Sequence, residues 1–331
     1  MAEYNNFVFS SHFSEQINGL IALKKGLGYQ YERQSEVLKR FDRFCLERWS
    51  HQKTLSKELV SDWLSACAGR SPKTLRHMLT PVSHLGAYIC NMGSEAYAFP
   101  TITLPREHRY TPHIYSSDEL QRFFDETDRC CYSVEAPLRH LMMPVLFRLL
   151  YCCGLRISEV LSLKVRDVDV ENGVLTVTDS KNGGERYVPM SEEMTRRCRE
   201  YHRAVHDSKE KHTYFFPSPT GEKLVYINIY SNFRRFLRNA GITHGGRKNA
   251  VRIHDFRHTF AVHCLKRWVK EEKDLNVYYP YLRVYMGHTL FRYTAYYLRL
   301  TADLYPDITE KLEKSLAGVI PSIGGDECED E

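Results

Sequence analysis

The chain has 331 residues, of which 43% are hydrophobic and 26% are charged. This composition is that of a folded protein with a sizeable core, and it excludes collagen-like, low-complexity and globally disordered chains. The net charge is +5 even though five of the last six residues are acidic. The rest of the chain is therefore moderately basic and suits a polyanionic partner.

Three features predict a cytoplasmic protein that does not cross a membrane. The longest mostly apolar run, residues 141–153, contains an arginine and is shorter than the roughly 20 apolar residues that span a bilayer. The first ten residues do not combine a basic region with an apolar one, as a signal peptide does. The ten cysteines include no CxxC pair, and several lie among apolar residues, which is typical of free thiols in a reducing cytosol.

The first hundred residues are predicted to form a small helical bundle. Apolar residues recur at the 3.6-residue spacing of a helix over residues 34–49. Ser56 is suited to cap a second helix, and Ser71, which precedes a proline, is suited to cap a third. Pro81 interrupts the apolar stripe of the third helix and predicts a kink there.

Lys73 and Arg76 lie in the first turns of the helix that Ser71 caps. The free backbone amides of a helix N-terminus favour anions, so basic side chains there add to an existing attraction for phosphate. We therefore predict that these two residues contact the phosphates of the polyanionic partner. The alternative, that they lie on a solvated helix face, stays open at this point.

A change in composition separates two parts of the chain. Residues 99–113 contain three prolines and little periodicity, and proline keeps such a segment extended. We therefore place a helical N-terminal domain at residues 1–104, a linker at residues 105–113 and a second domain at residues 114–331.

The second domain is predicted to be mainly helical with one small sheet. A helix that begins at Leu120 is expected to be capped by residues 117–119. Two short strands around the turn Asn182-Gly183-Gly184 predict an antiparallel hairpin. These strands are residues 173–178 and 186–189. The other predicted elements are a long apolar helix at residues 138–153, a short helix at 158–163, and helices from residue 192 to about residue 316.

Four short motifs of this second domain carry the functional signal. They are Gly154-Leu155-Arg156-Ile157-Ser158-Glu159, Ser180-Lys181-Asn182-Gly183-Gly184-Glu185-Arg186, His254-Asp255-Phe256-Arg257-His258, and Gly287-His288 with Tyr297 nine residues later. In this order and at this spacing they resemble the motifs of the tyrosine recombinases, or phage-type integrases. The resemblance covers residues 114–310, and residues 15–100 are more weakly similar to the core-binding domain with which that family clamps DNA. It implies a mainly α protein: a helical core-binding domain and a mainly α catalytic domain with a small antiparallel sheet.

The residue types suit nucleophilic displacement at a DNA phosphodiester. The transition state places negative charge on two non-bridging oxygens, which the permanently charged guanidiniums of Arg156 and Arg257 can clamp. The leaving 5′ oxygen needs a proton, which Lys181 at the tip of the predicted hairpin can supply. His254 and His288 can bind the phosphate by hydrogen bonds or exchange a proton near neutral pH.

Tyr297 is the predicted nucleophile. The family spacing of nine residues from the Gly-His histidine selects it over its neighbours Tyr293 and Tyr296. On a helix, Tyr296 points about 100° away from Tyr297, so the two cannot face the same phosphate. The resemblance also implies that the tyrosine is joined to the 3′ phosphate and that neither a metal nor ATP is needed.

Three residues of the motifs, His254, His258 and Glu159, have other interpretations. His254 and His258 stand four residues apart, as zinc ligands on a helix do, and His263 is a third candidate. The glutamate of the HExxH pattern is absent and no third ligand has convincing spacing, so we predict no metal and no other cofactor. Glu159 is predicted to be structural, holding a helix end or an arginine.

The resemblance predicts a site-specific recombinase or integrase that acts on double-stranded DNA and serves a mobile element or a replicon. It implies a homotetramer on paired DNA sites, and a monomer or dimer off DNA, with the helix at residues 308–316 docking either on a neighbouring subunit or on its own domain. The alternatives are a type IB topoisomerase, which needs no tetramer, and a DNA-binding module without catalysis. All six expected catalytic side chains are present, which disfavours the second alternative.

Overall fold

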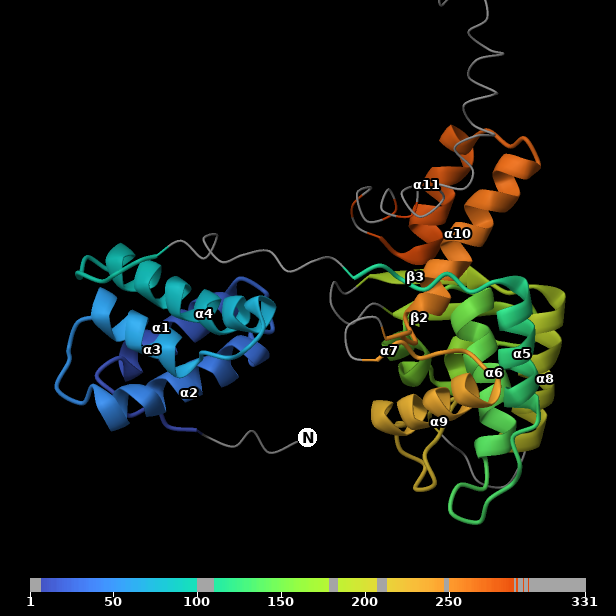
Figure 1. Cartoon of the computed structure of the whole chain (residues 1–331), viewed down its shortest axis with the longest axis horizontal. Helices are drawn as coiled ribbons and strands as arrows, with labels where there is room; N and C mark the ends of the chain where they lie inside the picture. The colour runs from blue at the N-terminus through green and yellow to red at the C-terminus, as the bar shows by residue number, and fades with distance from the viewer. Residues whose placement is uncertain are drawn as a thin grey trace, which may run out of the picture. The chain divides into compact units, whose positions relative to one another are not determined.

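The computed structural model describes residues 7–99, 110–178, 184–206, 213–246 and 250–288, together with residues 290, 294 and 297. The chain divides into two compact units, Met1–Arg109 and Tyr110–Glu331, and Figure 1 shows their elements. The described residues are mainly helical with one small antiparallel sheet, as predicted. None of the described helices is both long and apolar enough to cross a membrane.

Four described helices form the first unit, and their apolar faces share one core. Ser56 and Ser71 accept hydrogen bonds from backbone N–H groups one turn later, so both predicted caps are confirmed. Pro81, where a kink was predicted, is buried within α4, which continues through it without interruption. The helices are α1 (Ser14–Gly26), α2 (Glu32–Arg48), α3 (Lys57–Ala66) and α4 (Pro72–Asn91).

The second unit builds a helical domain around the predicted hairpin. Its described helices are α5 (Ser117–Asp128), α6 (Arg139–Cys152), α7 (Ile157–Ser162), α8 (Glu192–Val205), α9 (Tyr226–Asn239), α10 (Asp255–Lys270) and α11 (Leu275–Met286). Its strands are β1 (Val168–Asp169), β2 (Val174–Thr178) and β3 (Glu185–Pro189), paired antiparallel in the order β1-β2-β3. The predicted hairpin is confirmed by the β2–β3 pair. Strand β1 was not predicted, because its two residues are too few to show an alternation of apolar and polar side chains.

The predicted start of α5 was three residues too late. The N-cap is Ser116, and the helix begins at Ser117 rather than at Leu120. The hydroxyl of Ser116 accepts the N–H of Glu119, and the carboxylate of Glu119 accepts the N–H of Ser116. This reciprocal capping box satisfies two backbone donors, which is why the helix starts earlier than its first apolar residue.

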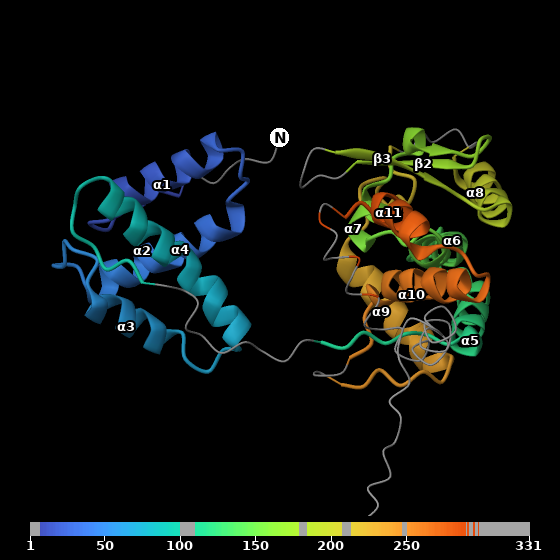
Figure 2. The same ribbon diagram turned by 90° about the horizontal axis from the view of Figure 1, so that it is seen from above.

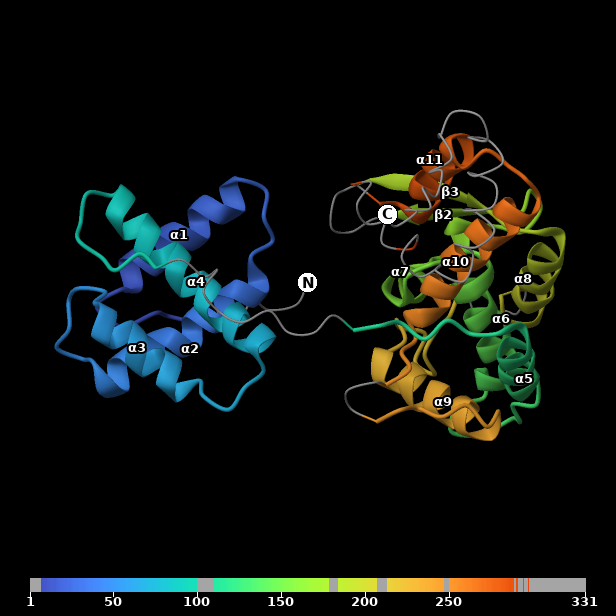
Figure 3. The same ribbon diagram turned by 45° about the horizontal axis from the view of Figure 1, so that its top comes forward.

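Helix α6 lies at the centre of the second unit, with α5, α8 and α10 packed against it. Because neighbouring helices cover it on several sides, most of its residues are apolar, as the sequence indicated. Aromatic rings fill the space next to it: the ring of Phe123 lies 5.3 Å from that of Phe147 and 5.0 Å from that of Phe256 on α10. Figures 2 and 3 show α10 beside α6 and α11 beside the β2–β3 pair. This packing brings α7, β3, α10 and α11 together.

The first described residues of the second unit are fastened to α10. The hydroxyl of Tyr110 donates to Oδ2 of Asp255 at 2.6 Å, and the N–H of Tyr115 donates to Oγ1 of Thr259 at 3.1 Å. The ring of Tyr115 stacks on Phe256 at 4.7 Å. The N-terminal turns of α10 are therefore held by residues 110–115 as well as by their packing against α6.

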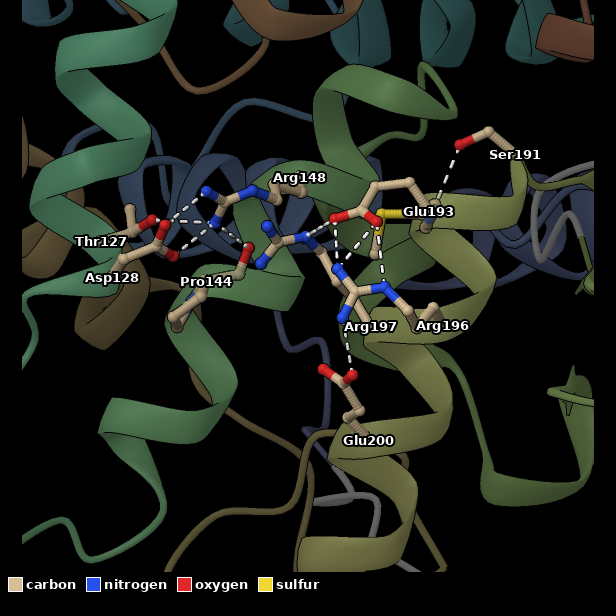
Figure 4. Close-up of polar contacts among 10 residues, drawn as sticks. Thr127, Asp128, Pro144, Arg148, Ser191, Glu193, Arg196, Arg197 and Glu200 are labelled. Carbon is tan, nitrogen blue, oxygen red and sulfur yellow. Dashed lines mark hydrogen bonds and ion pairs between the residues drawn. The ribbon is translucent and has the colours of Figure 1, made fainter.

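Ion pairs cover the surface formed by α5, α6 and α8 (Figure 4). Arg148 donates two 2.7 Å hydrogen bonds to Asp128. Arg196, which is half exposed, bonds to Glu193 and Glu200 on its own helix. Exposed pairs of this kind contribute little stability, so Arg196 is a suitable control position for substitutions of buried arginines.

Candidate active site

Arg156 occupies the N-cap of α7, directly after a turn that requires glycine. Gly154 has a φ of +58°, and a Cβ atom there would lie 2.4 Å from the ring of Phe260. The turn ends α6 and leaves the carbonyl of Gly154 free to accept a hydrogen bond. In the Gly-Leu-Arg motif, the glycine therefore provides the backbone conformation of the turn, and the arginine two residues later provides the guanidinium.

Glu159 holds both the start of α7 and two arginines. Its buried carboxylate accepts the N–H of Arg156 at 2.8 Å and Nη1 of Arg156 at 2.7 Å. It also accepts Nη1 and Nη2 of Arg186, at 3.0 Å and 2.9 Å. Burial raises the pKa of Glu159, but the hydrogen bonds and charge of Arg186 and the N–H of Arg156 outweigh it and lower the pKa below its usual value. The predicted structural role of Glu159 is confirmed.

Arg257 is a buried cation, 1% exposed, in the first turn of α10. Its Nη1 donates to the carbonyl of Gly154 at 2.6 Å, and its Nη2 donates to the carbonyl of Met286 at 2.5 Å. Burial lowers the pKa of the guanidinium to about 10, so it stays charged at neutral pH. Since Nη2 of Arg156 lies 3.4 Å from the carbonyl of Gly287, both arginines contact residues 286–288.

His288 is held as a neutral ring of one tautomer. Nη2 of Arg257 lies 2.9 Å from Nε2 of His288, and Nδ1 lies 2.8 Å from the hydroxyl of Thr294. A guanidinium only donates, so Nε2 is the acceptor and Nδ1 carries the proton. Burial, followed by the charges of Arg257 and Arg156, lowers the pKa of His288 to about 3. Thr294 was not singled out from the sequence, and it fixes this tautomer.

Tyr297 packs into the same cluster. Its ring centroid lies 5.4 Å from that of His258 and 6.0 Å from that of His288, and its charge when ionised raises the pKa of Arg257. The side chain is 2% exposed and packs against Ala261 and other apolar residues of α10 and α11. The other two candidate nucleophiles, Tyr293 and Tyr296, lie outside the described residues.

His254 and His258 lie at the start of α10 with their rings 4.7 Å apart and perpendicular. Burial, together with nearby positive charge and the neighbouring histidine, lowers the pKa of His254 to about 4 and that of His258 to about 3. His263, the third zinc candidate, directs Nδ1 to the hydroxyl of Tyr151 at 3.0 Å. Within the described ranges, no three His, Cys, Asp or Glu side chains gather in a group that could hold a metal.

These low histidine pKa values predict an acid-sensitive fold. Below a pH of about 6.5, histidines in the unfolded chain take up protons that His254, His258 and His288 do not take up when folded. The free energy of unfolding therefore falls as the pH drops toward about 4, by up to about 1.4 kcal/mol per pH unit for each histidine. Urea unfolding across this range measures the slope.

His258→Gln is the matched test of that pH dependence. It is expected to flatten the slope, whereas His51→Gln, at an exposed position of the other unit, is expected to leave it unchanged. An identical slope in wild type and His258→Gln would show that this histidine titrates normally in the folded protein.

The described structure does not place the remaining predicted site residues relative to this cluster. Lys181 and residues 308–316 lie outside the described residues. The last described pair of the hairpin is Thr178 and Glu185, so Lys181 belongs to the connection between β2 and β3. Lys73 is exposed and Arg76 is half-buried in the first turns of α4, in the other unit.

Comparisons with known proteins agree with the motifs. The profile of the phage integrase family matches residues 114–303. A putative integrase/recombinase of Sinorhizobium fredii, y4rB, is 29% identical over 309 residues, which are 92% of this chain and 98% of that protein. Tyrosine recombinase XerA of Pyrococcus furiosus is 30% identical over 176 residues, which cover 51% of this chain and 55% of that one.

Solved structures share the fold. The Tn1549 transposon integrase in complex with transposon right end DNA has a TM-score of 0.62 at 16% identity, covering 91% of this chain and 99% of that chain. The XerH site-specific recombinase bound to its palindromic difH substrate has a TM-score of 0.61 at 19% identity, covering 92% and 84%. At these identities the likeness concerns the fold alone.

Proposed function

Because the chain belongs to the phage integrase family, we propose that it is a tyrosine-type site-specific DNA recombinase that works through a 3′-phosphotyrosyl intermediate. One observation carries the proposal. The guanidiniums of Arg156 and Arg257 are held at residues 286–288, and Tyr297 packs beside His288 at the end of that stretch. The two proposed phosphate-binding cations and the proposed nucleophile therefore belong to one cluster of side chains.

In the proposed cleavage step, Oη of Tyr297 attacks the phosphorus of the scissile phosphodiester. The Oη–P bond forms as the P–O5′ bond breaks, so the phosphate remains on the 3′ strand end, joined to the tyrosine. The phenol loses one proton and the departing 5′ oxygen gains one, for which Lys181 is the proposed donor. Arg156 and Arg257 stabilise the charge on the non-bridging oxygens. Attack by the 5′ hydroxyl of another strand reverses the step and completes the exchange.

His254 is the proposed acceptor of the phenol proton. Its low pKa in this structure has burial as the first cause and the positive charge of Arg257 and Arg156 as the next. A phosphate anion bound between these arginines offsets their charge and so raises the basicity of the ring. His288 already accepts a hydrogen bond from Arg257, and we propose that it orients this guanidinium toward the phosphate.

We further propose that the partner is double-stranded DNA and that the enzyme serves a mobile element or replicon as a homotetramer on paired sites. The similar XerH and Tn1549 structures are complexes with DNA, and the latter protein is a transposon integrase. The N-terminal unit, with Lys73 and Arg76, is proposed to form the other half of a clamp on the duplex. We propose that such an enzyme works in the cytoplasm.

A nicked suicide substrate tests this function. The duplex is one that the protein selects from a random-sequence pool by gel shift, with a nick close to the scissile phosphate so that the released 5′-hydroxyl fragment diffuses away. In EDTA, the protein is expected to accumulate a DNA adduct that survives denaturing electrophoresis. Binding without any adduct would contradict the proposal, and relaxation of plasmids without paired sites would indicate a topoisomerase instead.

The clamp predicts steep salt dependence of DNA affinity. Each phosphate neutralised by a basic side chain releases counterions, so the logarithm of the affinity falls linearly with the logarithm of the salt concentration. Lys73→Ala is expected to reduce that slope by about 1, and Arg196→Ala, at the ion-paired surface of α8 (Figure 4), is expected to preserve it. Gel shifts over a salt series measure both, and a flat slope in wild type would contradict the clamp.

A further inference from the structure

The carboxylate of Glu159 is shared unequally by two arginines. Each of its oxygens accepts one hydrogen bond from Arg156 and one from Arg186. Arg186 uses two guanidinium nitrogens, at 3.0 Å and 2.9 Å, which is the forked pairing that suits a carboxylate. The guanidinium of Arg156 uses only Nη1, at 2.7 Å, and its Nη2 lies 3.4 Å from the carbonyl of Gly287. Arg186 is therefore the better-paired counterion of Glu159.

The three side chains also differ in burial. Those of Glu159 and Arg186 are 6% and 10% exposed, whereas that of Arg156 is 33% exposed. Nε of Arg186 donates to the carbonyl of Tyr285 at 3.0 Å, and a Cβ atom at Gly287 would lie 2.9 Å from its Nη1. Glu159 and Arg186 thus form an interior ion pair that α11 holds in place, and Arg156 lies on the side of that pair that solvent reaches.

The charges of this cluster favour a bound phosphate. Arg156, Arg186 and Arg257 contribute three positive charges and Glu159 contributes one negative charge, which leaves a net charge of plus two. All four groups act on His288: after burial, the charges of the three arginines lower its pKa, and the charge of Glu159 raises it. Without Arg186 the net charge falls to plus one. The buried carboxylate then acts on its neighbours through a medium that screens it weakly.

We propose that Arg186 is a positioning residue that neutralises Glu159 and thereby keeps Arg156 available as a cation for the scissile phosphate. It acts through Glu159, and it does not contact the phosphate itself. Without Arg186, both oxygens of the carboxylate are free to take the forked pairing with Arg156, whose guanidinium then binds a carboxylate in place of a phosphate. The inference rests on the proposed function, since it concerns one of the two cations of the proposed clamp.

Substitutions at both members of the buried pair separate charge from structure. Arg186→Gln is expected to slow single-turnover adduct formation on the suicide substrate by about 100-fold, the usual effect of losing one group that stabilises the transition state, with little change in DNA affinity. Arg186→Lys keeps the charge and is expected to stay within about tenfold of wild type. Arg186→Gln combined with Glu159→Gln is expected to recover to within about tenfold of wild type, because no carboxylate then competes for Arg156.

The exposed pair of Arg196 and Glu193 on α8 (Figure 4) is the matched control. Arg196→Gln, alone or combined with Glu193→Gln, is expected to match wild type, because an exposed pair contributes little. Thermal unfolding shows whether each variant is folded. If Arg186→Gln is unfolded, the comparison is made in the Glu159→Gln background, where adding Arg186→Gln is expected to change the rate by less than about threefold.

The outcomes distinguish this inference from the proposed function. A double variant as slow as Arg186→Gln, or slower, would show that Arg186 supports the structure of the site rather than its charge, and would overturn the inference. So would an Arg186→Lys variant as slow as Arg186→Gln, or an Arg186→Gln variant as fast as wild type. In each of these cases wild type still forms the adduct. If wild type forms no adduct, the proposed function fails and the role of Arg186 fails with it.

Discussion

Replacing Tyr297 with phenylalanine is expected to abolish the covalent DNA adduct while leaving the fold and DNA affinity intact. The substitution removes only Oη, which is the proposed nucleophile, and without it no bond to phosphorus can form. The remaining ring keeps its packing against Ala261, Leu265 and Met286 and its contacts with His258 and His288. Denaturing electrophoresis of reactions with the suicide substrate measures the adduct directly.

Two controls make this result specific to one hydroxyl. Tyr296→Phe removes the adjacent phenol, and Tyr281→Phe removes an exposed phenol of α11. Both variants are expected to form the adduct at close to the wild-type rate. An adduct that persists in Tyr297→Phe, or disappears in Tyr296→Phe with the protein folded, would assign the attack to a different side chain.

Arg156→Ala is expected to slow cleavage by about 100- to 1,000-fold, or about 3 to 4 kcal/mol of barrier, while DNA affinity changes little. The side chain of Arg156 is one-third exposed. When it is removed, the carboxylate of Glu159 still accepts hydrogen bonds from Arg186 and from the N–H of residue 156. The fold therefore tolerates the change. What is lost is one of the two cations that face the charge of the transition state.

Arg257→Ala is predicted to behave differently from Arg156→Ala. Arg257 is buried and donates to the carbonyls of Gly154 and Met286, so its removal leaves buried acceptors unpaired and destabilises the fold as well. The cleaner comparison is Arg156→Ala against Arg196→Ala, using single-turnover rates at saturating protein and affinities from gel shifts. Lost binding with an unchanged rate per bound complex would contradict a role in the transition state.

Much of the site was predictable because it rests on local rules. Gly154 and Gly287 provide backbone conformations that other residues adopt with strain, and Arg156 lies directly before α7, the short helix that the sequence predicts at residues 158–163. Glu159 three residues after Arg156 has the spacing of a capping box. These features depend on a few residues that are neighbours in the sequence, so they can be predicted from the sequence alone.

Other features depend on distant parts of the chain and could not be predicted. Arg186 appeared only as a spacing marker in its motif, because its partners Glu159 and Tyr285 are brought to it by the packing of α7 and α11 against β3. The tautomer of His288 is set by Arg257 and a threonine, again from two segments. The pKa values of the histidines follow from burial, and burial is a property of the assembled domain rather than of the motif.

The identity of the amino acid joined to DNA is the most direct measure of whether this cluster performs the attack. The wild-type adduct from the suicide substrate is digested with nuclease and protease, and the peptide that carries the nucleotide is sequenced by mass spectrometry. The expected result is a single nucleotide-linked peptide modified at Tyr297 through its phenolic oxygen. Modification at Tyr293, at Tyr296 or at a residue other than tyrosine would contradict it.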